Sequence, residues 1–94
     1  MITTGTIVKL KIPCLGNDVG RIGVVFNDYG TGCQVIFPNG EYDGFSTEEQ
    51  ATFLEEVGFD SVIGRYQFKN VMRVAEDYRV GVFDNAFQYD EKEI

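Results

Sequence analysis

The sequence predicts a mainly β protein, a small and strongly bent five-stranded antiparallel sheet with one inserted helix. Short apolar runs rich in β-branched residues at 22–26 and 35–37 have the length and composition of strands. Turn-forming residues separate these runs, and the pair Asn39-Gly40 accepts the positive φ angles of a tight hairpin. The segment 46–58 instead has the spacing of a helix.

Length and composition indicate one domain spanning residues 1–94. A chain of this size buries one modest core, and its 44% hydrophobic content argues against disorder. No apolar run approaches the roughly 20 residues that span a bilayer. Residues 1–5 carry neither the basic nor the apolar region of a secretory signal. We therefore expect a cytoplasmic protein with no membrane partner.

The first four strands are expected in the first half of the chain. Residues 6–12 alternate apolar side chains with Lys9 and Lys11, as in a half-buried strand. A loop leads to a second strand at 21–26 and a third at 33–37. A hairpin turn with Gly40 at positive φ then leads to a fourth strand at 41–45.

A capping box marks the start of the helix, because Ser46 precedes Glu49 by three residues. Phe53 and Leu54 share one side of the helical wheel, so we expect them to anchor the helix to the sheet. Gly58 is a candidate left-handed C-cap. The predicted helix therefore spans about residues 47–57.

The C-terminal third is less regular. Tyr66 to Phe68 alternates, and residues 71–74 have strand character. After Glu76 the apolar residues fit both the alternation of a strand and the spacing of a helix, and we favour a short C-terminal helix over a strand. The acidic tail from about residue 89 is expected to fray.

Part of this pattern resembles a known family. Residues 5–8 (GTIV), 20–25 (GRIGVV) and 34–37 (QVIF), followed by the turn at 39–40, resemble the small SH3-like barrels of the KOW type over about residues 5–45. The resemblance implies an SH3-like barrel, here with a helical insertion. It also implies binding of nucleic acid, of ribosomal or transcription proteins, or of peptides. The nucleic-acid-binding members carry basic loops, whereas the loop 14–20 contains Asp18 and no Lys or Arg.

The residue types argue against catalysis and against bound cofactors. The chain has no histidine, which removes the usual general base and the commonest metal ligand. Cys14 and Cys33 have no neighbouring cation in the sequence to lower the pKa of a thiol, and we favour reduced thiols over a disulfide. The glycines precede strands, unlike a phosphate-binding loop, and the acids lack the order of a calcium loop. We expect no enzyme activity, no cofactor and no metal.

Negative charge is concentrated in the middle of the chain. The formal net charge is −7, and residues 41–64 contain seven acids and no Lys or Arg. Such a molecule repels phosphate backbones, so nucleic acid is an unlikely partner on charge alone. The seven acids can form a solvated face or a surface for a basic protein, and the tyrosines can belong to the core or to that surface.

We expect a non-catalytic protein-binding module that uses an acidic surface to bind a basic partner protein. Its candidate contact residues are Asp43, Glu55, Glu56, Tyr29, Tyr42 and Tyr66. One alternative is KOW-like nucleic-acid or ribosome- and transcription-associated binding through Arg65, Lys69, Arg73 and Arg79. Another is a small acidic inhibitor of the phage type, which mimics nucleic acid and blocks a nucleic-acid-binding enzyme.

Overall fold

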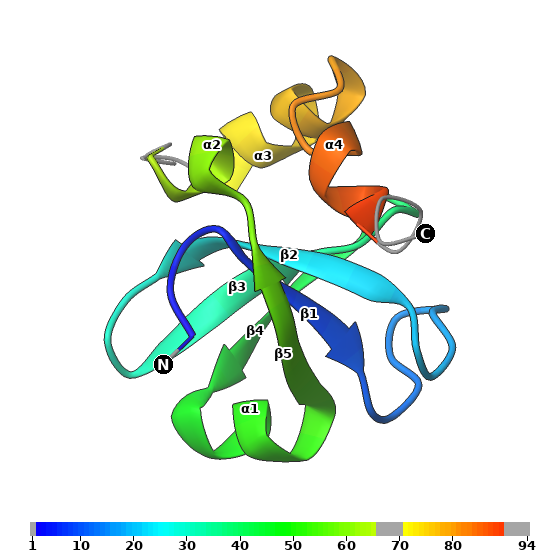
Figure 1. Ribbon diagram of the computed structural model, residues 1–94, viewed down its shortest axis with the longest axis vertical. Coiled ribbons are helices and arrows are strands. Elements are labelled where there is room, and N and C mark those ends of the chain that lie inside the picture. The colour runs from blue at the N-terminus through cyan, green and yellow to red at the C-terminus, as the bar shows by residue number, and fades with distance from the viewer. Residues whose placement is uncertain (1, 66–70, 90–94) are drawn as a thin grey trace.

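One five-stranded antiparallel sheet forms the centre of the computed structural model, which describes residues 2–65 and 71–89 (Figure 1). Its spatial order is β4-β3-β2-β1-β5, so the first four strands form a meander and β5 returns to pair with β1. No pairing joins β4 to β5 within the described residues, so the sheet is not closed. The mainly β antiparallel prediction is confirmed. The strands are β1 (Thr6–Leu10), β2 (Ile22–Asp28), β3 (Gly32–Ile36), β4 (Tyr42–Ser46) and β5 (Leu54–Phe59).

Short helices lie at opposite ends of the sheet (Figure 1). Helix α1 (Thr47–Phe53) connects β4 to β5. Helices α2 (Ser61–Gly64), α3 (Val71–Arg79) and α4 (Asp84–Phe87) follow β5 and lie together at the other end. Among the described residues, no helix has the length and apolar character needed to cross a bilayer.

Apolar side chains cover both faces of the sheet. On the face that we call outer, residues of β1, β2 and β3 pack against Ile63, Val74 and Ala86 from the three C-terminal helices and against Phe83, the residue before α4. On the inner face, Leu54 of β5 packs with residues of the first four strands. Strands buried on both faces read as continuous apolar runs rather than alternating ones, which explains the sequence of β2. The inner-face cluster is Val8, Leu10, Val25, Cys33, Val35, Phe37, Phe45 and Leu54.

The predicted capping box starts α1, but the helix is shorter than predicted. The Ser46 hydroxyl accepts from the Glu49 N–H, and the Glu49 carboxylate accepts from the Ser46 N–H. Leu54 already has extended backbone, so the predicted helix to residue 57 and the Gly58 C-cap are wrong. Pairing with β1 satisfies the backbone of residues 54–59 and places Leu54 in the inner core, which outweighs local helical spacing.

The β3–β4 turn follows the prediction. Gly40 has a φ of 86°, and its N–H donates to the Phe37 carbonyl at 2.9 Å. The first strand ends at Leu10, earlier than expected, and Ile12 is 38% exposed beyond it.

The C-terminal region is helical. Helix α3 replaces the strand expected at 71–74, because Val74 turns into the outer-face core while Arg73 points to solvent. Helix α4 confirms the short C-terminal helix. At the start of the predicted tail, the Tyr89 hydroxyl donates to the Val57 carbonyl at 2.7 Å. The alternation at 66–68 and the tail beyond Tyr89 lie outside the described residues.

Candidate binding surfaces

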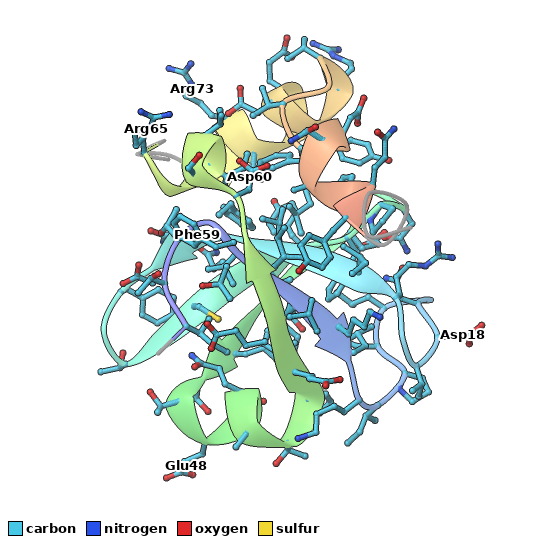
Figure 2. All side chains as sticks on the ribbon, viewed as in Figure 1. Asp18, Glu48, Phe59, Asp60, Arg65 and Arg73 are labelled. Carbon is cyan, nitrogen blue, oxygen red and sulfur yellow. The ribbon has the colours of Figure 1, made fainter. Side chains whose placement is uncertain are left out.

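Exposed carboxylates lie on β4, α1 and the start of β5, a region that we call the acidic end. Figure 2 shows Glu48 at the opposite end of the molecule from Arg65 and Arg73. The seventh acid of segment 41–64, Asp60, is instead buried and caps α2 through the N–H groups of Val62 and Ile63. Glu41 is exposed in the β3–β4 turn, which lies against α3, where the Tyr78 hydroxyl donates to the Pro38 carbonyl. The exposed acids of the acidic end are Asp43, Glu48, Glu49, Glu55 and Glu56.

Two of these carboxylates have a local role at the open edge of β4. Phe37 N–H donates to the Glu41 carbonyl, and the alternation of an antiparallel ladder then points the N–H groups of Gly44 and Ser46 away from β3. Asp43 Oδ1 accepts from the Gly44 N–H at 2.8 Å, and Glu49 Oε1 accepts from the Ser46 N–H at 3.0 Å. These side chains block the edge against another strand.

Glu55 and Glu56 lie on the other edge of the sheet, on β5. Glu55 is directly opposite Lys9 of β1, so the two side chains emerge on the same face as a cross-strand pair of opposite charge. Glu56 follows it on the opposite face. Both residues belong to a strand that begins directly after α1, and not to the last turns of the helix predicted to span 47–57.

The structure separates the candidate tyrosines. Tyr29 is 52% exposed, and its ring lies over the backbone of Gly32 and Gly44, where an added Cβ would meet its hydroxyl at 2.9 and 3.3 Å. Tyr42 is half-buried and packs edge-on against Phe26, with ring centroids 5.8 Å apart. Tyr66 lies outside the described residues.

The predicted contact residues therefore do not form one site. Asp43 is opposite Val35, which faces the inner core, whereas the Tyr29 ring covers Gly44 on the outer face. Glu55 and Glu56 occupy the far edge strand. What the candidate acids share is exposure to solvent, and not mutual contact.

Two cavities were not predicted from the sequence, because their walls come from distant segments. The first, which we call the α1 cavity, has a volume of 280 Å³ and is lined by Ile2, Asp28, Gly30, Gly32, Thr47 and Gln50. The second has a volume of 400 Å³ and lies between the β1–β2 loop, the β3–β4 turn and α4. Its lining residues are Asp18, Val19, Gly20, Arg21, Ile22, Pro38 and Phe87.

The cysteines are free thiols in apolar or acidic surroundings. Burial, with a smaller contribution from Asp28, raises the pKa of Cys33 to about 11. Burial and then Asp43 also raise the pKa of Cys14. Both thiols are protonated at neutral pH, which makes them weak nucleophiles and weak metal ligands. Among the described residues, no three His, Cys, Asp or Glu side chains are grouped to hold a metal ion.

A different surface lies where β5 meets α2. The Phe59 ring is 57% exposed and rests on Gly64, where an added Cβ would lie 2.5 Å from the ring. Arg65 follows at the end of α2, and its Nε donates to the Ser61 carbonyl. Of the predicted basic residues, Arg65, Arg73 and Arg79 are exposed, and Lys69 lies outside the described part of the chain.

Comparison of the chain with protein-family models, with curated proteins and with solved structures found no match. Function is therefore inferred from the geometry and charge of the chain itself.

Proposed function

We propose that this protein is a non-catalytic protein-binding module whose acidic end binds a basic partner protein. The observation that supports it is the set of five exposed carboxylates on β4, α1 and β5, in a stretch without any Lys or Arg. A surface with an excess of one sign of charge speeds capture of a partner of the other sign.

The architecture favours a binding scaffold. A four-stranded meander whose fifth strand returns to β1 is consistent with the SH3-like, KOW-type resemblance over residues 5–45. The absence of histidine from the sequence and the raised pKa values of the thiols favour a non-catalytic role. Free thiols also favour a cytoplasmic location, which belongs to the same proposal.

Charge neutralisation tests the proposal. Partners retained from a cell extract at low salt are identified, and their association rates are measured with wild type and with Glu55→Gln/Glu56→Gln. Glutamine is preferred to lysine because Lys at position 55 would face Lys9. The double variant should slow association about 3- to 10-fold and flatten its salt dependence, since steering depends on charge.

The matched control is Asp18→Asn/Glu76→Gln, which removes two exposed acids outside the acidic end. Glu76 pairs with Arg79 at the surface, so its neutralisation has little effect on stability. Association should be nearly unchanged in this control. Equal slowing in both double variants, or none in either, would reject the acidic end as the binding surface.

The KOW-like alternative has its own observation. Arg65 and Arg73 are exposed at the end of the molecule away from Glu48 (Figure 2), beyond the exposed ring of Phe59. Proteins that bind single-stranded nucleic acid use arginine side chains for the backbone and accessible aromatic rings on which the bases stack. Direct binding to RNA or DNA would favour this alternative.

The inhibitor alternative uses the acidic end itself. Carboxylates would occupy the basic groove of a nucleic-acid-binding enzyme, as a phage-type mimic does. The retained partner distinguishes this role from general protein binding. A mimic would capture a nucleic-acid-binding enzyme, and duplex DNA would compete with it for that enzyme.

A further inference from the structure

The α1 cavity lies within the acidic end, where two chain segments are held together. The N–H of Thr47, the first residue of α1, donates to the carbonyl of Thr31 in the β2–β3 loop. Asp28, at the end of β2, accepts through Oδ2 from the N–H and hydroxyl of Thr4, at 2.9 and 3.2 Å. These contacts fix the walls of the cavity on the loop, on α1 and on the N-terminal segment.

The wall combines apolar surface with hydrogen-bond acceptors. Ile2, which packs against the inner-face cluster, supplies the apolar part. Within the described residues, Asp28 accepts its hydrogen bonds through Oδ2, and Gln50 uses its amide nitrogen, which donates to the Phe45 carbonyl. Asp28 Oδ1 and the Gln50 carbonyl oxygen thus remain as acceptors, alongside the hydroxyl of Thr47.

Charge around the cavity is negative. Glu48 and Glu49 follow Thr47 in the first turn of α1. Lys11, which follows β1, is bonded through Nζ to the Ala51 carbonyl, in the second half of α1. The negative charge of Asp28 also contributes to the raised pKa of Cys33.

We propose that the α1 cavity receives an arginine or lysine side chain of the basic partner. The methylenes would lie on Ile2 and the glycine backbone, and the cation would donate to Asp28 Oδ1 and to Gln50. Long basic side chains have this combination of an apolar stem and a cationic head. The cavity volume of 280 Å³ is slightly below the range of small-molecule sites, about 300–1,000 Å³. A cavity of this size suits one side chain. The proposal rests on the acidic end being the partner-binding surface.

A short peptide tests the cavity without the partner. The probe is acetyl-Gly-Arg-Gly-amide, titrated into the full ¹⁵N-labelled chain at low salt and followed by amide chemical shifts. Shifts should concentrate at Gly30, Gly32 and the side-chain amide of Gln50. The same peptide with citrulline, a neutral isostere of arginine, should not bind.

Asp28→Asn and Asp18→Asn form a matched pair of variants. Asparagine keeps an acceptor for Thr4, so Asp28→Asn retains the contacts that hold the wall. It should weaken the arginine peptide about fivefold or more, as expected for one charge-assisted hydrogen bond at a partly exposed site. Asp18→Asn removes the same charge from the β1–β2 loop and should change affinity less than about twofold.

Three results would overturn the cavity proposal. They are shifts spread evenly over the acidic end, equal binding of the citrulline peptide, and unchanged affinity in Asp28→Asn. If partner association still depends on Glu55 and Glu56, such a result rejects the cavity and leaves the acidic end standing. Peptide binding in the cavity, with partner association insensitive to Glu55 and Glu56, would keep the cavity as a site for a cationic side chain. It would reject the carboxylates of the acidic end as the groups that capture the partner.

Discussion

Gly5 lies where two backbone segments approach too closely for any side chain. An added Cβ would be 2.7 Å from the Cα of Gly64 and 2.8 Å from the Asp60 carbonyl oxygen, and φ is 97°. The Asp60 N–H donates to the Gly5 carbonyl at 2.8 Å, so this contact joins the start of β1 to the turn into α2. A glycine here lets the C-terminal helices sit against the sheet.

Gly5→Ala should therefore be much more destabilising than Gly20→Ala. Gly20 has a similar φ of 90°, but its Cβ would meet nothing within 4 Å. Backbone strain alone costs roughly 1–2 kcal/mol, the loss expected for Gly20→Ala. Gly5→Ala adds a backbone clash, so its loss in urea unfolding should exceed that of Gly20→Ala by at least about 1 kcal/mol. Equal losses would show that the backbone of Asp60 and Gly64 moves to accept a Cβ at position 5 without a further loss of stability.

Cys33 should make stability fall at alkaline pH. Burial raises its pKa from 9.0 to about 11, so between these values the folded protein holds a proton that the unfolded chain releases. Its stabilising contribution is complete below about pH 9 and is lost as pH rises toward 11. The free energy of unfolding, measured from pH 7 to 11, should fall less steeply in Cys33→Ala. Parallel curves for the two proteins would contradict this assignment.

At the boundary between α1 and β5, the local helical pattern competes with pairing to the distant strand β1. Leu54 is 4% exposed and packs in the inner cluster, but from a strand and not from the helix. Leu54→Ala should cost roughly 2–5 kcal/mol by leaving a cavity in that core. Val19→Ala, at a side chain that is 60% exposed, should change stability by less than about 0.5 kcal/mol. Chemical denaturation of both variants measures the difference, and a small loss at Leu54 would mean that β5 is peripheral.

Sequence patterns predicted the elements that depend on local chemistry. The Ser46–Glu49 box and the Gly40 turn are short-range devices, and both are present. The end of α1 was wrong because β5 depends on β1, more than 40 residues earlier. The strand predicted at 71–74 was wrong because Val74 contacts a sheet face that no local pattern identifies.

The site was less predictable than the fold for the same reason. Six of the seven acids of segment 41–64 are exposed, but Asp60 is buried as the cap of α2, a role that the charge pattern did not identify. The structural roles of Asp43 and Glu49 at the β4 edge, and the pairing of Glu55 with Lys9, depend on strand register. The α1 cavity needs Ile2, Asp28 and Gln50 in one place, and these residues share no sequence motif.

For the whole molecule, charge predicts no meaningful binding to nucleic acid at physiological salt. Phosphate binding needs several basic contacts on one groove or strand, and the net charge here is −7. Fluorescence anisotropy with duplex DNA and single-stranded RNA should show no binding up to about 10 μM protein at about 0.15 M salt. Salt-sensitive binding that weakens in Arg65→Ala or Arg73→Ala would instead support the KOW-like alternative.

The outer face of the sheet has a consequence for synthesis of the chain. Its apolar residues on β1, β2 and β3 are covered mainly by Val74, Phe83 and Ala86, which come roughly 40–50 residues after β3 in the sequence. At a translation rate of about 5–20 residues per second, that delay is roughly 2–10 s. For that time the nascent chain can form its meander while one apolar face stays open to the ribosome surface and to chaperones. Translational pausing after β4 would lengthen this exposure, whereas pausing after α4 has emerged would not.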